Sequence, residues 1–189
     1  MTYLEIFMGP MFSGKSSKLV EVITEHKNDP TIKQLVINHT SDIRYGKNSI
    51  ITHNNESIPC HSITNLTDIL ELPDYMMATH VYIDEGQFFQ DLRDSVALIM
   101  LNSNKHIYVV GLDSDFEIKP FANLGILSLI PLANKVSKFT AKCHVCQQPA
   151  PYTMRISNSN EQILVGTNVE YQPSCFIHHN KVIPHLGKY

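Results

Sequence analysis

Short runs of hydrophobic residues alternate with polar segments along this chain. The first run, Tyr3–Met8, ends at a Gly-Pro pair, which is typical of a buried strand that leads into a turn. In residues 16–28 the apolar positions Leu19, Val22 and Ile23 recur at helical spacing. The N-terminal pattern therefore predicts a strand, a loop and a helix in that order.

Later segments repeat this alternation. Three β-branched runs predict strands at Gln34–Asn38, His80–Asp84 and His106–Leu112, and Asp91–Asn104 has helical character. Strands that alternate with helices predict an α/β fold with a mostly parallel sheet covered on both faces. The stretch from Asn38 to Cys60 is polar and irregular, which predicts a structureless functional or mobile loop.

The pattern changes after about Thr140, where Cys, Pro, Gln and Asn become frequent and the apolar segments become short. We therefore divide the chain into a main α/β domain, residues 1–139, and a small metal-stapled lobe, residues 140–189. The residues from His179 onwards are predicted to form a tail.

Length and composition narrow the class of protein. A chain of 189 residues with 43% hydrophobic content can bury one main core, and its net charge of −3 opposes binding to nucleic acid. The N-terminus does not read as a signal peptide, and no apolar run approaches the roughly 20 residues of a membrane span. We therefore expect a soluble cytoplasmic protein with neither a nucleic-acid nor a membrane partner, in which closely spaced cysteines indicate metal rather than disulfides.

The segment that follows the first predicted strand matches the phosphate-binding pattern GxxxxGK[ST]. Its backbone N–H groups would surround phosphate oxygens, Lys15 would reach the β- and γ-phosphates, and the Ser16 hydroxyl would hold Mg²⁺. A chance match is expected in roughly one chain in a hundred of this length, and the position between a strand and a helix favours the functional interpretation. The predicted nucleotide loop comprises Gly9, Pro10, Met11, Phe12, Ser13, Gly14, Lys15 and Ser16.

Two adjacent carboxylates end the strand at His80–Asp84. Open α/β sheets bind ligands at the carboxyl ends of their strands. Asp84 is therefore the candidate ligand for Mg²⁺, and Glu85 is the candidate general base that accepts a proton. A turn with solvated acids is the alternative for an isolated Asp-Glu pair. Arg44, in the long polar segment, would steady the transferred phosphate or is simply a solvated loop arginine.

Four residues near the C-terminus have metal-ligand spacing. A CxxC (Cys143, Cys146) and a CxxH (Cys175, His178) together would close a tetrahedral structural zinc site. His179 is an alternative fourth ligand, although the CxxH spacing favours its neighbour, and unrelated cysteines are the remaining alternative.

Several segments together resemble one family. GPMFSGKS, SDIRYG, IDEGQFF, GLDSDFEIKPF, CHVC, YTMRI and EYQPSC occur in the order and spacing of the type II thymidine kinases, which include cytosolic, bacterial and poxvirus-like enzymes. The resemblance runs from about Tyr3 to His178.

This resemblance implies a RecA-like P-loop fold with a C-terminal zinc-binding lasso that closes over the site. It implies transfer of the γ-phosphate of ATP to the 5′-hydroxyl of thymidine, or of deoxyuridine, in nucleoside salvage. Glu85 would be the base, with Lys15, Ser16, Asp84 and Mg²⁺ at the phosphates and Arg44 and Arg155 at the phosphate or the 5′ end. A homotetramer and feedback inhibition by thymidine triphosphate are also implied. The nucleoside would be enclosed by Met11, Phe88, Leu112, Phe116, Phe121, Thr153 and Tyr171, and by the lasso residues Gln162, Ile163, Leu164, Val165 and Gly166.

Three departures from the family pattern stand out: His178 in place of a fourth cysteine, Thr167 in place of a glycine, and Asp115 in place of a frequent threonine. Two other classes of protein fit the sequence less well. A P-loop switch protein would need a guanine-reading NKxD, whereas the chain has NKVS at residues 134–137. A zinc-ribbon module for nucleic acid is opposed by the acidic balance.

Overall fold

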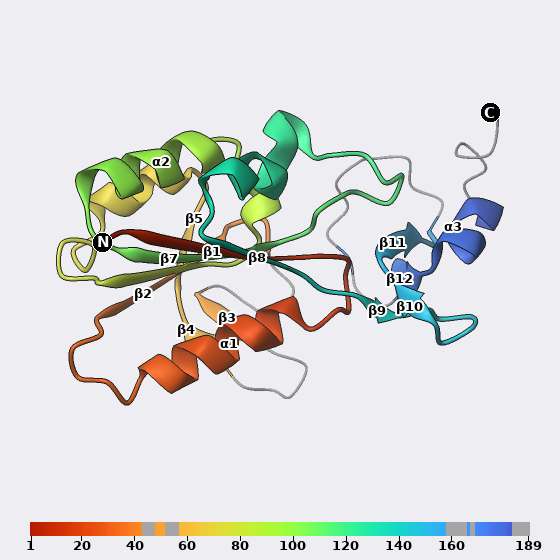
Figure 1. Cartoon of the computed structure of the whole chain (residues 1–189), viewed down its shortest axis with the longest axis horizontal. Coiled ribbons are helices and arrows are strands. Elements are labelled where there is room, and N and C mark those ends of the chain that lie inside the picture. The colour runs from red at the N-terminus through yellow and green to blue at the C-terminus, as the bar shows by residue number, and fades with distance from the viewer. Residues whose placement is uncertain (43–47, 52–56, 158–165, 167–168, 183–189) are drawn as a thin grey trace.

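The computed structural model describes residues 1–42, 48–51, 57–157, 166 and 169–182. Its centre is a six-stranded sheet in the order β5-β2-β6-β7-β1-β8 (Figure 1). Neighbouring strands of this sheet run parallel throughout, which confirms the predicted mostly parallel α/β fold. The strands are β1 (Tyr3–Met8), β2 (Gln34–His39), β5 (His61–Ile63), β6 (His80–Ile83), β7 (His106–Gly111) and β8 (Lys135–Lys138).

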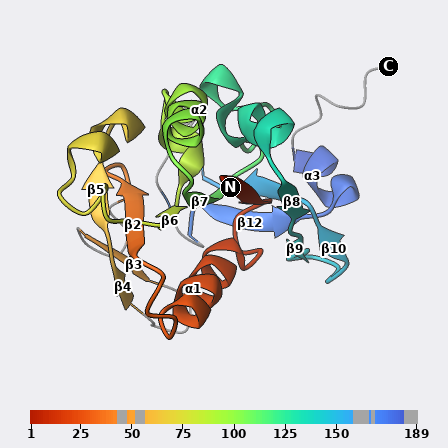
Figure 2. The same cartoon turned by 60° about the vertical axis from the view of Figure 1, so that its left-hand side comes forward.

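Helical segments cover both faces of the sheet. Helix α1 (Lys15–His26) lies on one face, and α2 (Leu92–Asn102) lies on the other (Figures 1 and 2). The second face also carries the 3₁₀ segments η1 (Leu66–Glu71) and η3 (Ala122–Leu132), while η2 (Gly86–Phe88) follows β6 directly.

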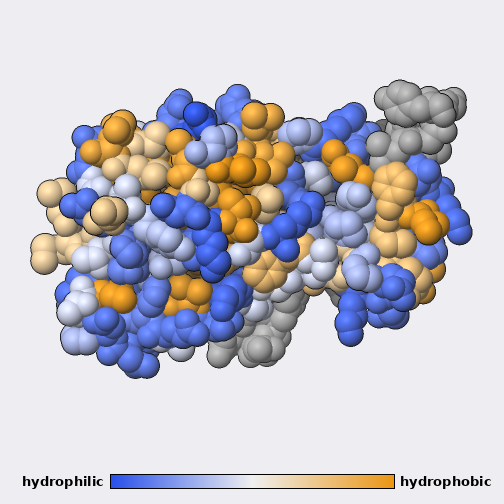
Figure 3. All heavy atoms as spheres, in the orientation of Figure 1, coloured by the Kyte–Doolittle hydropathy of each residue, from blue (hydrophilic) through white to orange (hydrophobic). Residues whose placement is uncertain are grey.

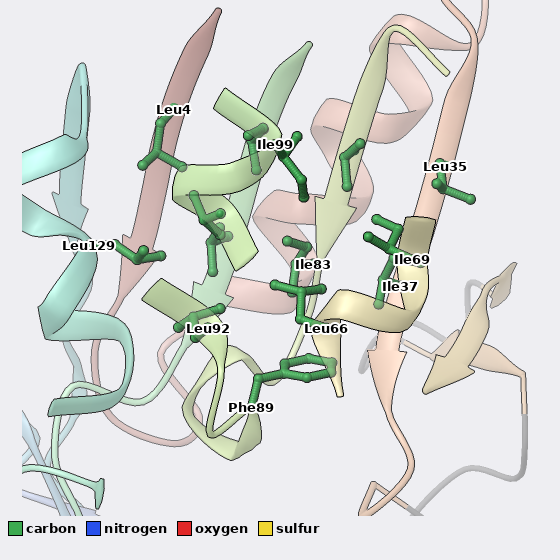
Figure 4. Close-up of a cluster of buried hydrophobic side chains, with 14 of the residues drawn as sticks. Leu4, Leu35, Ile37, Leu66, Ile69, Ile83, Phe89, Leu92, Ile99 and Leu129 are labelled. Carbon is green, nitrogen blue, oxygen red and sulfur yellow. The ribbon is translucent and has the colours of Figure 1, made fainter. Parts of the chain in front are cut away.

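The strands serve both faces because their side chains alternate. Leu35 and Ile37 of β2 join the cluster under α2, whereas Val36 between them joins the cluster under α1. The cluster on the α2 side is mostly aliphatic, with Leu66, Leu92 and Ile99 packed against the strands (Figure 4). This two-sided burial explains why the central strands read as nearly continuous hydrophobic runs.

A separate small lobe follows the sheet. It contains two antiparallel pairs, β9 (Ala141–Lys142) with β10 (Pro149–Ala150) and β11 (Tyr152–Arg155) with β12 (Tyr171–Ser174), and the short helix α3 (Phe176–Val182). The lobe lies beyond the end of β1 at which the loop with Gly9 begins (Figure 1). Its hydrophobic cluster is small and consists of Ala141, Ala150 and the metal-ligand candidate Cys143, with Cys146 and Cys175 packed against it.

Two local predictions were wrong. The polar stretch after Asn38 is not structureless, because β3 (Ser49–Ile51) and β4 (Ser57–Pro59) form an antiparallel hairpin. Strands of three residues are too short to show an alternating pattern. His179 does not begin a tail, since it is fully buried within α3; its burial comes from contacts with residues distant in sequence.

The face of the molecule shown in Figure 3 mixes hydrophilic and hydrophobic side chains, as is normal for a globular surface. Among the described helices, none combines the length and apolarity needed to cross a bilayer.

A cluster of aromatic rings lies where the central strands begin. His80 stacks at 14° to Tyr108 and at 26° to Tyr82, and its ring centroid is 4.7 Å from that of His106 and 5.0 Å from that of His26. Burial, together with these two neighbouring histidines, lowers the pKa of His80 to about 4, against a weak opposing effect of Asp29. The fold therefore holds this imidazole in its neutral form.

We expect this histidine to make the protein sensitive to acid. An unfolded histidine titrates near pH 6.5, so the stabilising effect of neutral His80 is complete above that pH and is lost as the pH falls towards 4. Thermal unfolding of the wild type and of His80→Phe, which keeps a stacking ring, should be compared at pH 7.5 and pH 5. The melting temperature should fall less in the variant; equal falls would contradict this assignment.

Candidate active site

The predicted nucleotide loop connects β1 to α1 at the carboxyl edge of the sheet. Gly9 has φ +148°, and a Cβ there would lie 2.4 Å from the carbonyl oxygen of Phe139, so the backbone needs glycine. Lys15 is buried, and its Nζ donates to the carbonyl oxygen of Pro10 at 2.6 Å. The loop thus curls around the lysine ammonium at the N-terminal end of α1, the geometry that binds phosphate.

The small lobe is hydrogen-bonded to this loop. The N–H of Met11 donates to Oγ1 of Thr153, on β11, at 2.9 Å. Phe139 also donates its N–H to the carbonyl oxygen of Met8 at 2.8 Å, just before the chain enters the lobe. Met11 and Thr153, which the family resemblance places together, are therefore direct neighbours.

The two predicted acids lie beside the loop. Asp84 is almost fully buried, and its Oδ1 is 3.4 Å from the hydroxyl oxygen of Ser16 at the start of α1. Adjacent ligands of an octahedral Mg²⁺ with bonds of 2.0–2.1 Å are roughly 3 Å apart, so this pair of oxygens suits such an ion. Glu85 has φ 53° and ψ 38°, a left-handed conformation that costs a non-glycine residue roughly 1–2 kcal/mol. Backbone strain of this kind is concentrated at functional sites.

Gln87 fixes the side chain of Glu85 and was not singled out from the sequence. Its Nε2 donates to Oε2 of Glu85 at 2.5 Å, and its Oε1 accepts the backbone N–H of Leu112 at 2.8 Å. Gln87 is only 1% exposed, and a Cβ on Gly111 would lie 2.6 Å from Gln87 Oε1. The carboxamide is therefore enclosed between the end of β7 and the candidate base.

A second group of predicted site residues forms an aromatic cluster. The guanidinium of Arg155, a residue that is 4% exposed, lies over the Phe116 ring at 3.9 Å and donates to the hydroxyl of Tyr171 at 2.5 Å. Gly166 is buried against Tyr171, where an added Cβ would approach the ring to 3.0 Å. Strands β11 and β12 bring Arg155 and Tyr171 together, because the two residues pair across the ladder.

The remaining predicted residues have varied positions. Phe88 lies in η2, with its ring centroid 5.7 Å from that of His39, and Phe121 is buried at the start of η3. Asp115 is buried, and its Oδ1 accepts the N–H groups of Glu117 and Lys119 at 2.9 Å each. This departure from the family pattern thus organises the loop that carries Phe116. Arg44, Thr167 and the lasso residues 162–165 lie outside the described residues.

The four metal-ligand candidates converge in the small lobe. Their ligand atoms all lie within 4.8 Å of one another, and this is the one such group found among the described residues. The Sγ atoms of Cys146 and Cys175 are 3.8 Å apart, and the Cys143 Sγ is 3.5 Å from Nδ1 of His178. A tetrahedral ion with zinc-like bond lengths of about 2.3 Å to sulfur and 2.0–2.1 Å to nitrogen separates its ligands by about 3.8 Å and 3.6 Å, respectively.

Backbone N–H groups around Cys143 favour the thiolate form of its side chain, which is the form that binds a metal ion. Burial opposes ionisation of this thiol, but the N–H groups of Cys146, Cys175 and Val145 outweigh it and lower the pKa of Cys143 to about 5. His178, not His179, completes the set, because the His179 ring is directed to the carbonyl oxygen of Phe116, 2.8 Å away. The four side chains can therefore hold a metal ion with no coordination position left open.

Comparisons with known proteins agree on one family. The family model described as "Thymidine kinase" matches residues 2–179. The chain is 38% identical to the thymidine kinase of Sheeppox virus over 92% of its own length and 94% of the viral protein. It is 37% identical to the thymidine kinase of Yaba monkey tumor virus, over 95% and 96% of the two chains. It is 34% identical to thymidine kinase a of Arabidopsis thaliana, over 93% of this chain and 74% of the plant protein.

We expect the purified protein to contain one metal ion per chain, bound by the four convergent ligands. Cys146→Ser should lower the metal content measured by elemental analysis, because a serine hydroxyl is a poor replacement for a thiolate in this tetrahedron. Cys60→Ser is the matched control. Cys60 lies in the main domain, where burial raises the pKa of its thiol to about 11, and its loss should leave the metal content unchanged. Equal metal content in both variants would contradict the assignment.

Proposed function

The chain belongs to the thymidine kinase family, and we propose how its residues divide the transfer of the γ-phosphate of ATP to the 5′-hydroxyl of thymidine. One observation carries the proposal. The phosphate-type loop, with Lys15 and Ser16, lies directly beside the paired acids Asp84 and Glu85 at the carboxyl edge of one parallel sheet. Phosphoryl transfer needs a phosphate cradle, a metal-side acid and a base within one site, and this edge provides all three.

The phosphates of ATP are bound by residues 9–16 in this proposal. The Lys15 ammonium, already enclosed by the loop, neutralises charge on the β- and γ-phosphates. Ser16 and Asp84 would hold Mg²⁺, and the ion would supply positive charge beside the phosphates when bound. The Met11 N–H is bonded to Thr153, so we assign Met11 to the nucleoside side of the loop.

Glu85 takes the proton of the 5′-hydroxyl. Glu85 follows β6 in a strained backbone conformation, and the Gln87 amide restrains its carboxylate through a hydrogen bond. The restraint leaves the carboxylate in a fixed orientation before the substrate arrives, which reduces the ordering needed for reaction. Gln87 is thus a positioning residue for the base. Arg44 is proposed to steady the transferred phosphate.

The nucleoside is enclosed by aromatic and apolar residues from both parts of the chain. Phe116 and Tyr171 are already organised around the Arg155 guanidinium, and we propose that this cluster forms one wall of the pocket. Because Phe116 and Tyr171 hold the Arg155 guanidinium, we propose that Arg155 acts mainly by keeping these two rings in place. Phe88, Leu112, Phe121, Met11, Thr153, Gly166 and residues 162–165 are proposed to complete the enclosure.

We further propose that the metal ion is zinc with a structural role, since three thiolates and one imidazole form a closed tetrahedral set. Residues 140–189 then act as a lid over the main domain, residues 1–139, and exclude water from the transferred phosphoryl group. The same proposal extends to four further properties. The protein forms a homotetramer, is inhibited by thymidine triphosphate and accepts deoxyuridine. It is located in the cytoplasm, which is the host cytoplasm if the source is viral.

Phosphate transfer from ATP should be measured with and without thymidine, and thymidine monophosphate should form only in its presence. Glu85→Gln should lower kcat by roughly a hundredfold or more, because a general base typically contributes 10²–10⁴-fold, while ATP binding is retained. Glu25→Gln, exposed on α1, is the matched control and should behave as wild type. ATP consumption that is independent of thymidine, with no monophosphate formed, would refute the function.

The positioning role of Gln87 predicts a selective loss of turnover. Gln87→Met keeps the size of the side chain but removes both the donor to Glu85 and the acceptor for Leu112, so kcat should fall about 10- to 100-fold with little change in KM for ATP. Gln87→Glu keeps an acceptor for Leu112 but replaces the donor with a second carboxylate that faces Glu85, so it should lose turnover as well. Gln90→Met, at an exposed position, is the control. Full activity in Gln87→Glu would show that the bond to Glu85 has no role.

A further inference from the structure

His179 lies at the contact between the metal-binding lobe and the loop that carries Phe116. It is fully buried, and its Nε2 is 2.8 Å from the backbone carbonyl oxygen of Phe116, a residue 63 positions earlier in the chain. A carbonyl oxygen can only accept, so Nε2 must carry the proton and donate it. The ring also packs against Tyr152 of β11, with centroids 5.7 Å apart.

The helix fixes where this imidazole points. The N–H of His179 donates to the carbonyl oxygen of Cys175 at 2.9 Å, which closes the first turn of α3. Consecutive helical residues point about 100° apart. His178 therefore faces the cysteine sulfurs while His179 faces the Phe116 carbonyl group of the main domain.

The Phe116 loop is restrained at three points. Asp115 organises its backbone from within, the Arg155 guanidinium covers the face of the Phe116 ring, and His179 holds the Phe116 carbonyl group. The first restraint is internal to the loop and the second acts on the side chain. The His179 bond alone among these ties the loop backbone to the helix that carries a metal ligand.

We infer that His179 is a positioning residue that couples the metal-bound helix α3 to the Phe116 wall of the nucleoside pocket, and so sets affinity for the nucleoside. This inference rests on the proposed role of Phe116. The phosphate loop is held by a different side chain of the lobe, through the bond from the Met11 N–H to Thr153 Oγ1. Loss of the His179 bond should therefore weaken thymidine binding and leave ATP binding unchanged.

The test compares His179→Leu, which removes the donor, with His179→Gln, whose amide N–H reaches about as far as the imidazole Nε2–H. Thymidine dissociation constants should be measured by calorimetry, with KM for ATP and metal content determined in parallel. His179→Leu should raise the thymidine Kd about tenfold, the upper range for one hydrogen bond, with metal content retained. His179→Gln should recover most of the affinity.

His144→Leu is the matched control, because His144 also follows a metal ligand directly but is exposed. It should bind thymidine as the wild type does. His179→Asn, whose amide is too short to reach Phe116, replaces the leucine variant if that variant does not fold. Wild-type affinity in the leucine or asparagine variant, a glutamine variant as weak as the leucine variant, or metal loss in the leucine variant would each overturn the inference.

A readout without substrate separates this inference from the proposed function. Amide hydrogen exchange in residues 113–121 should accelerate in His179→Leu, while residues 143–146 keep their protection. Unchanged exchange in residues 113–121 would overturn the coupling. If the wild type failed to bind thymidine but exchange responded as expected, the proposed function would fail while the link between α3 and the loop stood.

Discussion

Burial of both faces of a parallel sheet is the constraint on which the site depends. Because neighbouring strands run in the same direction, β1, β6 and β7 all end at one edge, although their sequences are far apart. The phosphate loop, the paired acids and the backbone N–H of Leu112 therefore meet without any local sequence signal that links them. Helices α1 and α2 enclose the sheet between two apolar layers and so fix this edge.

Close packing then makes the edge rigid. The loop at Gly9 fits only because glycine lets Phe139 approach, and the Gln87 carboxamide fits only because Gly111 has no side chain. Enclosed in this way, Gln87 restrains a glutamate whose backbone is already strained. A carboxylate in a left-handed turn, held by a buried amide, costs stability, and in the proposed mechanism it keeps the base in one orientation.

The small lobe positions residues of the proposed pocket, but its apolar core is too small to keep the lobe folded without further support. Its buried hydrophobic cluster is small, so a tetrahedral metal ion is a natural means to order it. Two hydrogen bonds carry that order into the main domain: Thr153 accepts from the phosphate loop, and His179 donates to the loop of Phe116. The loop at Met11 and the loop at Phe116, on two sides of the proposed pocket, are therefore both hydrogen-bonded to the small lobe.

Sequence alone determined the elements whose signal is local. The glycines and lysine of residues 9–16, the run that ends in Asp84 and Glu85, and the CxxC and CxxH pairs are each readable because their chemistry needs fixed spacing. The α/β class followed from alternating strands and helices. Short elements such as the β3–β4 hairpin, and the burial of His179, gave no such signal, because three-residue strands lack a period and burial depends on distant partners.

Only the tertiary structure decided how these pieces act on one another. It separated His178 from His179, gave Gln87 its place between Glu85 and β7, assigned Asp115 to the Phe116 loop, and stacked Arg155 on Phe116. Residue spacing does not predict these contacts. A hydrogen bond depends on where two atoms lie in space, whereas the sequence specifies only the order of the residues along the chain.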